Sequence, residues 1–158
     1  MQISVEAIGD GAAKASLCAR IIAELPMWFG RPESNAQYIR NIVDRDAFAG
    51  MIDGQALGLI ALECHFAVTC NIWWLGVRPV AHRRGVGRAL IERAAEHARA
   101  RGCQRLAVET VSPRADSPEY DLTRLFYEAM GFVPFIELEP EPGDYLMWML
   151  REVGKSRQ

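Results

Sequence analysis

Residues 71–90 of the chain read NIWWLGVRPVAHRRGVGRAL, and this stretch decides the fold. Its first seven residues are apolar at almost every position, which is typical of a strand buried in the middle of a sheet, and Arg78-Pro79 ends that strand. From Val86 to Ala100 the apolar residues form one stripe among arginines and glutamates, as in an amphipathic helix, and Gly102 supplies the stop. The stretch therefore predicts a central strand, a glycine-rich turn and a helix.

The turn between this strand and this helix reads His82-Arg83-Arg84-Gly85-Val86-Gly87-Arg88. The first amides of a helix point outward without partners and carry partial positive charge, so they can hold a phosphate. Glycines at 85 and 87 would let a ligand approach the main chain, and Arg83, Arg84 and Arg88 would add charge-assisted contacts. The turn thus predicts a pyrophosphate site, although a plain surface turn with solvated arginines stays open.

Two other nucleotide-binding motifs are excluded at this position. A P-loop needs a lysine followed by Ser or Thr after its second glycine, whereas Gly87 is followed by Arg88-Ala89. No third glycine completes a dinucleotide fingerprint. The sequence therefore favours neither ATP hydrolysis nor NAD binding.

The rest of the chain alternates between patterns of strand and helix period. An Asp53-Gly54 hairpin, a cap at Asp10 and a cap at Ser34 mark three of the boundaries. In the second half, Leu122, Phe126 and Met130 form the apolar row of a helix. We expect strands at 3–8, 47–51, 55–66, 71–77, 106–111, 132–138 and 145–150, with helices at 10–25, 34–42, 86–100 and 120–130.

Length and composition narrow the class of protein. The chain has 158 residues and a formal net charge of −2, which fits one compact domain and argues against a nonspecific nucleic-acid binder. We expect a single domain over 1–152 with a tail at 153–158. No apolar run could span a bilayer and no leader is evident, so a cytoplasmic protein is the expectation.

The four cysteines are scattered without a C-x-x-C pair, so reduced and buried thiols are expected. A zinc site from Cys64, His65, Cys70 and His82 would not match a standard ligand spacing. The sequence therefore predicts no metal.

Three segments together resemble the GNAT N-acetyltransferase superfamily. They are Val77-Arg78-Pro79, the turn from Arg83 to Leu90, and Leu125-Phe126-Tyr127-Glu128-Ala129-Met130-Gly131-Phe132. The resemblance covers essentially the whole chain and implies an α+β fold, an α/β three-layer sandwich with a mixed central sheet of about seven strands and about four helices. It also implies acetyl-CoA as cosubstrate.

The resemblance further implies roles for individual residues. The turn would bind the CoA pyrophosphate through His82, Arg83, Arg84, Gly85, Val86, Gly87 and Arg88. The strand residues Leu75, Gly76 and Val77 would pair with the pantetheine arm through their main chain. Tyr127 matches the tyrosine that commonly protonates the departing CoA thiolate, and a phenol is protonated at neutral pH.

The chain departs from the family pattern at two positions. His82 stands where Arg or Gln is usual, which removes one side-chain contact to the coenzyme but leaves the backbone cradle. Asn71 stands where many members carry a glutamate base, and an amide cannot accept a proton at neutral pH. Candidate bases are His65, our first choice because histidine is the residue type whose ordinary pKa is nearest neutrality, together with Glu63, Glu109 and a water chain.

The function expected from the sequence is acetyl transfer from acetyl-CoA to a primary amine, by direct attack in a ternary complex. Trp28, Phe29, Asn71 and Glu109 would bind the acceptor, a small molecule or a peptide, and the acidic stretches 116–121 and 137–141 would attract it. No nucleic acid and no membrane partner is expected, and the oligomeric state stays open, a homodimer included. The alternative is a non-catalytic acyl-CoA-binding module that senses or recruits.

Overall fold

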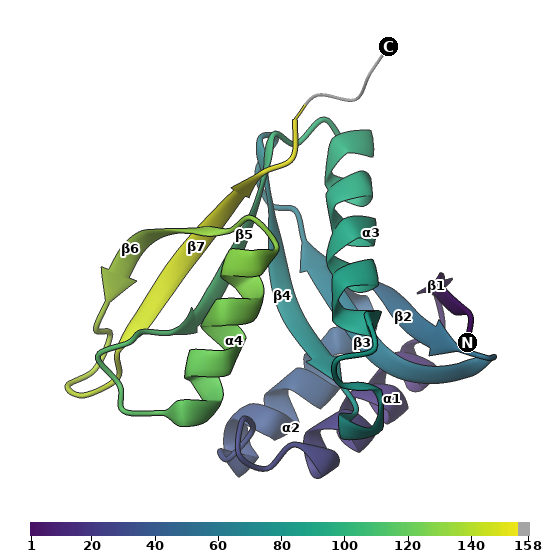
Figure 1. Ribbon diagram of the computed structural model, residues 1–158, viewed down its shortest axis with the longest axis horizontal. Coiled ribbons are helices and arrows are strands. Elements are labelled where there is room, and N and C mark those ends of the chain that lie inside the picture. The colour runs from purple at the N-terminus through teal and green to yellow at the C-terminus, as the bar shows by residue number, and fades with distance from the viewer. Residues whose placement is uncertain (155–158) are drawn as a thin grey trace. The chain divides into compact units, whose positions relative to one another are not determined.

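The computed structural model describes residues 1–154, so the last four residues of the expected tail lie outside the described part. Its seven strands form a mixed sheet in the order β1-β2-β3-β4-β5-β7-β6, and four α-helices accompany it (Figure 1). The predicted fold class and the predicted succession of elements are confirmed. The elements are β1 Ile3–Ile8, α1 Gly11–Glu24, α2 Pro32–Asn41, η1 Ile42–Asp44, β2 Asp46–Ile52, β3 Gln55–Glu63, β4 Thr69–Val77, η2 Pro79–Ala81, α3 Val86–Ala100, β5 Arg105–Val111, α4 Pro118–Ala129, β6 Val133–Leu138 and β7 Leu146–Glu152.

The chain divides into two compact units. The first unit comprises Met1–Glu63 and Trp73–Ala94, and the second comprises Cys64–Ile72 and the residues from Ala95 onward. Strand β4 and helix α3 each contribute residues to both units. Among the described residues, no helix is long and apolar enough to cross a membrane.

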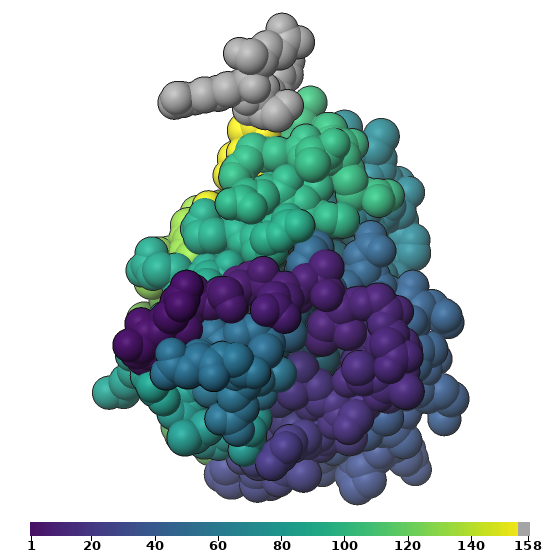
Figure 2. All heavy atoms as spheres, turned by 90° about the vertical axis from the view of Figure 1, so that its right-hand side faces the viewer, coloured from purple at the N-terminus to yellow at the C-terminus, as the bar shows by residue number. Residues whose placement is uncertain are grey.

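In the first unit, β1, β2 and β3 form an antiparallel meander. Asp53 and Gly54 connect β2 to β3 and both have positive φ, 49° and 83°, as a type I′ hairpin turn requires. Figure 2 shows the residues of β1, in purple, beside the blue residues of the β2–β3 hairpin on one face. The hairpin predicted from the Asp-Gly dipeptide is confirmed.

Helices α1 and α2 enclose the core of the first unit. Asp10 caps α1, since its Oδ2 accepts a hydrogen bond from Ala13 N at 3.2 Å. The core below the helix is apolar and is built around Cys18, Ile21, Ile22, Leu25, Ile42, Ala47, Leu59, Ala61 and Trp74. Lys14 is buried too, and its ammonium group donates to Arg45 O at 2.7 Å and to Val43 O at 3.3 Å.

In the second unit, β5 pairs in parallel with the start of β4 and antiparallel with β7, and β6 pairs with the far side of β7. Because side chains alternate along a strand, β5 and β7 present two faces. One face is buried and carries Leu106, Val108, Met147 and Met149, and α4 packs against it. The opposite face carries Ala107, Glu109, Val111, Leu146, Trp148 and Leu150, of which all but Ala107 are partly or fully exposed.

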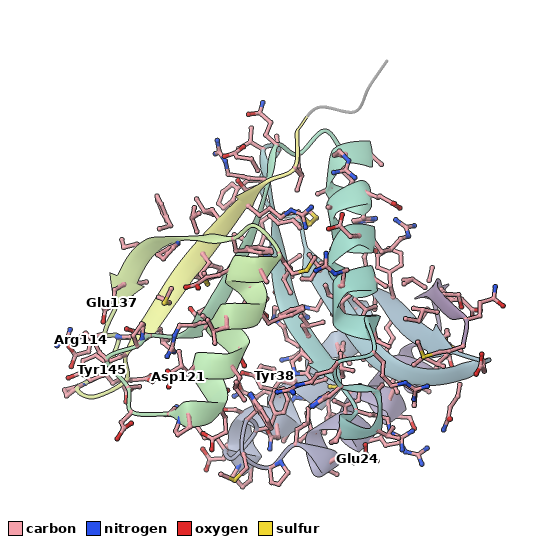
Figure 3. The ribbon with its side chains drawn as sticks, viewed as in Figure 1. Glu24, Tyr38, Arg114, Asp121, Glu137 and Tyr145 are labelled. Carbon is pink, nitrogen blue, oxygen red and sulfur yellow. A yellow bond between two sulfur atoms is a disulfide. The ribbon has the colours of Figure 1, made fainter. Side chains whose placement is uncertain are left out.

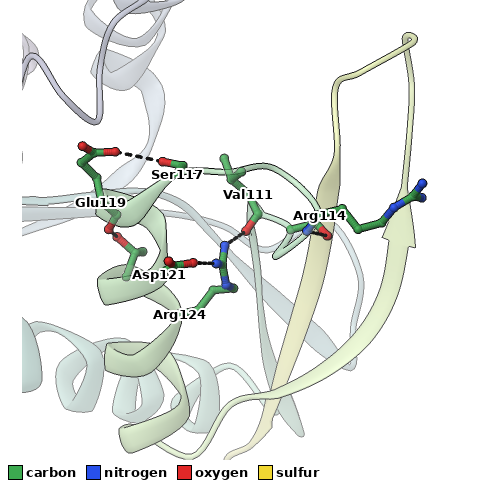
Figure 4. Close-up of polar contacts among 8 residues, drawn as sticks. Val111, Arg114, Ser117, Glu119, Asp121 and Arg124 are labelled. Carbon is green, nitrogen blue, oxygen red and sulfur yellow. Dashed lines mark hydrogen bonds and ion pairs between the residues drawn. The ribbon is translucent and has the colours of Figure 1, made fainter.

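Arg124 fixes α4 to the end of β5. It is buried, and its guanidinium donates hydrogen bonds to Val111 O and to the Asp121 carboxylate (Figure 4). Position 124 on the inner face of a helix is where an apolar residue would be expected. Its burial is possible because both ends of the guanidinium have acceptors.

Several element boundaries and one helix face differ from the sequence prediction. Helix α2 begins at Pro32, which needs no amide partner at the first helical position, and not at a Ser34 cap. Strand β3 ends at Glu63 and not at Phe66. Leu122 is 56% exposed, because the inner face of α4 is formed by Arg124, Tyr127 and Met130.

The prediction of four reduced thiols is wrong. Cys64 and Cys70 form a disulfide across the connection from β3 to β4, whereas Cys18 and Cys103 are free and buried. Cys64 and Cys70 are six residues apart, so they do not form the C-x-x-C spacing by which a cysteine pair is recognised in a sequence. The disulfide also removes two of the four ligands of the zinc site that the sequence had made conceivable.

Candidate active site

The turn before α3 has the backbone shape of an anion site. After η2 the chain passes through Arg83 with φ of 60° and Gly85 with φ of 90°, and α3 begins at Val86. The first helical hydrogen bond runs from Ala89 N to Gly85 O at 3.0 Å. The amides of residues 86–88 therefore have no acceptor within the helix, as at every helix start.

The side chains of the turn comprise one buried valine and three exposed arginines. Val86 is buried, whereas Arg83, Arg84 and Arg88 are exposed. Three arginine residues are thus next in sequence to a helix N-terminus whose dipole is positive, and the Arg84 guanidinium donates to Met1 Sδ at 3.1 Å. Gly85 is exposed as well, and its positive φ suits glycine. Chemically, this arrangement can bind a diphosphate.

Val86 is held by two glycines of the sheet. A Cβ atom on Gly50 would lie 2.5 Å from Val86 Cγ1, and one on Gly58 would lie 2.8 Å from it. The start of α3 therefore rests directly on the backbones of β2 and β3. The turn derives its position from this close contact.

His82 is engaged with the protein. Its Nε2 donates to Val77 O at 2.7 Å, and the Trp28 ring contacts it edge-on at 6.3 Å between centroids. This contact ties the turn to the last residue of β4 and to the connection between α1 and α2. His82 thus has a structural partner within the first unit, in addition to the coenzyme contact that the sequence suggests.

The end of β4 supplies the predicted main-chain segment Leu75, Gly76 and Val77. Gly76 is required by packing, because a Cβ atom there would meet the Trp74 ring at 2.5 Å and the Ile21 side chain at 2.7 Å. Beyond the strand, Arg78 forms two hydrogen bonds with Glu24 at the end of α1, of 2.8 and 3.0 Å. These bonds hold the pKa of Glu24 below its usual value, first because Arg78 donates to the carboxylate.

The aromatic residues of the first unit form a connected cluster. Phe29 stacks on Trp74 at 5.4 Å, and Tyr38, labelled in Figure 3, meets Trp73 edge-on at 5.7 Å. Trp28 and Phe29 are both half-buried. Phe29 and Trp28 both pack against the core, and Trp28 also contacts His82.

Tyr127 is in the second unit, on the inner face of α4. It is buried between Phe126 and Phe132, each 5.4 Å away between ring centroids. Burial raises the pKa of Tyr127 well above its usual value, and the nearby Tyr120 adds to the shift. The phenol is therefore a proton donor and not a phenolate at neutral pH.

The second unit also contains the remaining predicted site residues. His65 is exposed in the connection between β3 and β4, next to the disulfide. Asn71 on β4 lies opposite Ala107 on β5, and Glu109 follows two positions along β5 on the same face. Asn71 Oδ1 is buried and has no hydrogen-bond partner among the described residues.

Sequence reasoning missed two neighbours of Glu109. Trp148 is its cross-strand partner on β7 and is half-buried. Asp144, in the loop before β7, lies close enough for its carboxylate to raise the pKa of Glu109, after the larger effect of partial burial. The strand pairing of β5 with β7 could not be read from either strand alone.

The acidic stretches have partners within their own unit. Glu137 accepts from Ser112 Oγ at 2.9 Å and pairs with Arg114 at 3.6 Å, and the Arg114 guanidinium also lies over the Tyr145 ring (Figure 3). Glu119 accepts from Ser117 Oγ at 3.0 Å (Figure 4). These contacts account for several of the carboxylates through local structure.

Two structural features point to one family: the glycine- and arginine-rich turn that joins the central strand to α3, and the mixed seven-stranded sheet. The family model described as "Acetyltransferase (GNAT) domain" matches residues 44–134, which is more than half of the chain. The chain belongs to the GNAT acetyltransferase family. The family and the enzyme class predicted from the sequence, N-acetyltransferase, are thereby confirmed.

The chain is also similar to one curated relative and to two solved structures. It is 43% identical over 84 residues to mycothiol acetyltransferase of Beutenbergia cavernae, an alignment that covers 52% of this chain but only 26% of that protein. A GNAT-family acetyltransferase from Desulfovibrio desulfuricans superposes with a TM-score of 0.81 at 23% identity, covering 97% of this chain and 100% of the other. A GNAT acetyltransferase from Elizabethkingia anophelis with acetyl-CoA bound gives a TM-score of 0.66 at 15% identity, covering 95% and 97%.

Proposed function

We propose that this GNAT domain transfers an acetyl group from acetyl-CoA to a primary amine. The observation that carries the proposal is the turn before α3, where the amides of residues 86–88 have no acceptor within the helix and the neighbouring Arg83, Arg84 and Arg88 are exposed. We further propose that residues 1–152 act as one catalytic domain, that the protein works in the cytoplasm, and that no metal takes part.

The residues present fit the coenzyme. The exposed turn with Gly85 at positive φ suits a diphosphate, since a helix N-terminus favours anions and arginine binds phosphate oxygens with paired donors. Leu75, Gly76 and Val77 offer an extended main chain to the pantetheine arm. Acetyl-CoA, when bound, supplies the thioester whose carbonyl carbon accepts the amine.

Tyr127 protonates the departing sulfur in this proposal. The amine attacks directly in a ternary complex, the bond from carbon to nitrogen forms, the bond from carbon to sulfur breaks, and the thiolate takes the phenolic proton. The raised pKa of Tyr127 keeps that proton in place until the sulfur anion develops. His65 is the sequence-based candidate for removing the proton of the amine.

The acceptor is proposed to be a small molecule or a peptide with a primary amine. Support comes from the family and from the relative named mycothiol acetyltransferase. Trp28, which contacts His82, remains with Phe29 a sequence-based candidate for contact with the acceptor.

Calorimetric titration with acetyl-CoA and CoA tests the coenzyme site. Arg84→Gln should weaken binding of both ligands by about tenfold, because a charge-assisted contact to phosphate is lost. Arg101→Gln, an exposed arginine beyond the end of α3, is the matched control and should bind as the wild type does. Absence of any binding to the wild-type protein would refute the proposal.

Release of free thiol from acetyl-CoA across a panel of amines tests the chemistry. Tyr127→Phe should lower turnover by about 100-fold while leaving the affinity for acetyl-CoA unchanged, because only proton donation is removed. Tyr145→Phe serves as the control for loss of a phenol elsewhere. Equal turnover in Tyr127→Phe and wild type would remove Tyr127 from the mechanism.

Asn71 favours a second candidate function, a non-catalytic module that binds acyl-CoA. In that case calorimetry would show binding of acetyl-CoA, yet no amine in the panel would release thiol. A longer acyl-CoA belongs in the same titration, since the width of the acyl site is not fixed by the turn.

A further inference from the structure

The two sulfur atoms of the disulfide between Cys64 and Cys70 belong to residues of unequal accessibility. Cys70 lies within β4 and is 0% exposed, whereas Cys64, which directly follows the last residue of β3, is half-buried. The connection that the disulfide closes is exposed at every residue from His65 to Val68. A molecule that approaches from solvent therefore meets Cys64 before it can meet Cys70.

The other two cysteines are enclosed by the fold. Cys18 and Cys103 are free thiols that are 0% and 3% exposed. All four cysteines of the chain lie in the described part, so Cys64 is the most accessible of them. Thiol chemistry on the folded protein should concentrate at Cys64, because the rate of thiol–disulfide exchange depends on access to the attacked sulfur.

The disulfide can open without unfolding the strand that follows it. Val68 O accepts hydrogen bonds from Gln104 N at 2.8 Å and from Arg105 N at 3.2 Å. The pairing of β4 with β5 then begins at Thr69, opposite Arg105. The start of β4 is thus held by main-chain bonds that do not depend on the sulfur bridge. Opening the bridge should loosen residues 65–67 and leave β4 in place.

The residues next to Cys64 in sequence do not repel an approaching thiolate. The Glu63 carboxylate is paired with Arg45 at 3.1 Å, which offsets its negative charge. His65 carries no negative charge in either protonation state. Phe66 is 73% exposed and offers an apolar surface to the carbon chain of a small molecule. The site therefore suits a small thiol, whatever the charge on the rest of that molecule.

We propose that the Cys64–Cys70 disulfide is a modification site, at which a low-molecular-weight thiol opens the bridge and stays attached to Cys64. The thiolate of the small molecule attacks Cys64 Sγ, a new sulfur–sulfur bond forms, and the bond to Cys70 breaks. Cys70 leaves as a thiolate and takes a proton from water. Attack by Cys70 on the adduct reverses the step and releases the thiol, so the exchange needs no other oxidant or reductant.

Mass spectrometry of the peptides tests where the adduct forms. Protein isolated without reductant is held with 2-mercaptoethanol and hydroxyethyl disulfide, quenched in acid, unfolded and alkylated. We expect mercaptoethanol on Cys64 together with an alkylated Cys70, and at least about tenfold less adduct on Cys70, Cys18 or Cys103. As much adduct on Cys70 as on Cys64, or no adduct at any ratio of thiol to disulfide, overturns the proposal.

Two single variants test the unequal access of the two sulfurs. Cys70→Ala leaves Cys64 as a free thiol, and Cys64→Ala leaves Cys70 as a free thiol. Circular dichroism establishes that each variant is folded before it is mixed with hydroxyethyl disulfide. Cys64→Ala should form its adduct at least about tenfold more slowly than Cys70→Ala, because its remaining sulfur is buried. Equal rates in the two folded variants would remove the basis of the site.

Hydrogen exchange distinguishes a modification site from a bridge that holds the fold together. Formation of the adduct should raise the exchange rate of the amides at 65–67 by at least about tenfold and leave those at 69–72 unchanged. Loss of protection at 69–72 would show that the bridge is a structural staple, and the proposal would fail.

The inference does not depend on the proposed function. 2-Mercaptoethanol has no diphosphate, so its reaction at Cys64 does not require the coenzyme site. A chain that forms the Cys64 adduct but releases no thiol from acetyl-CoA keeps the modification site and overturns the proposed function. A chain that acetylates amines but forms no adduct does the reverse.

Discussion

Gly50 on β2 and Gly58 on β3 lie directly opposite each other, and Val86 fills the space that their side chains would occupy. Two strands thus leave a gap of matching size for one helix residue. The filled gap places the first turn of α3, which carries the proposed diphosphate site. Close packing of this kind transmits small changes in volume, because protein interiors have few voids.

Gly58→Ala should therefore disturb the proposed diphosphate site, although residue 58 is not part of that site. The added methyl group would approach Val86 Cγ1 to 2.8 Å and Leu90 Cδ1 to 3.0 Å, so α3 must shift. Overpacking of this kind costs about 1 to 3 kcal/mol of unfolding free energy. Chemical denaturation measures that loss, and calorimetry should show weaker binding of CoA.

The control for this substitution is Gly9→Ala. A Cβ atom at position 9 meets nothing within 4 Å, and the residue does not have positive φ. Its stability and its CoA affinity should stay at wild-type values. If Gly58→Ala binds CoA as well as Gly9→Ala does, the position of the turn does not depend on the glycine pair.

Glu24 and Arg78 should make stability depend on pH in the acid range. Glu24 has a lowered pKa in the folded state, mainly because Arg78 donates to it, so its contribution is complete above its ordinary pKa of 4.5. The contribution is lost as the pH falls through the lowered folded value. The melting temperatures of wild type and Glu24→Gln should differ at pH 7 and converge in acid. Glu6→Gln, which changes an exposed residue of β1, is the control variant. A constant difference at every pH would contradict the ion pair.

Replacing Arg124 should lower the free energy of unfolding more than replacing Asp121 does, although the two side chains are paired. Arg124→Met leaves Val111 O without its donor inside the second unit and should cost about 1 to 3 kcal/mol. Asp121 is largely exposed, so Asp121→Asn should cost less than about 1 kcal/mol. Urea denaturation of both variants decides the order, and the reverse order would mean that Arg124 is held mainly by the carboxylate.

The cysteines should respond differently to thiol reagents. Protein isolated without reductant should show two free thiols after unfolding and four after reduction, because Cys64 and Cys70 are joined. In the folded protein Cys18 should resist alkylation at pH 8, since burial raises its pKa to about 12. Mass spectrometry of the alkylated peptides measures the number of free thiols and the extent to which Cys18 is alkylated. Four free thiols in protein isolated without reductant would contradict the Cys64–Cys70 disulfide.

Local patterns were sufficient to predict the order of the elements. The apolar stripe from Val86 to Ala100 reproduces the bounds of α3, and Asp53-Gly54 reproduces the hairpin, because both depend on neighbouring residues. Helix α2 was placed two residues late because Pro32 opens a helix as well as a serine cap does. The inner face of α4 was misjudged because Arg124 occupies a position where hydrophobicity patterns expect an apolar side chain.

The candidate site could be predicted where it is local and not where it depends on strand pairing. The glycines and arginines of the turn are contiguous, so their shape and charge are visible in the sequence. Trp148 became a neighbour of Glu109 only through the register of β5 with β7, across about forty intervening residues. The glycine pair at 50 and 58 likewise has meaning only once β2 and β3 are aligned.

Strand β6 has one open edge, and four of its apolar residues, Val133, Phe135, Ile136 and Leu138, are exposed. Such an edge can recruit foreign strands and grow into fibrils. Pro134 has no amide hydrogen, and the register of β6 shifts between Pro134 and Ile136, so the edge does not offer a regular row of hydrogen-bonding groups. Pro134 therefore limits aggregation through this edge, a role unrelated to acetyl transfer. Its replacement should lower the solubility of the protein during storage before it changes anything else.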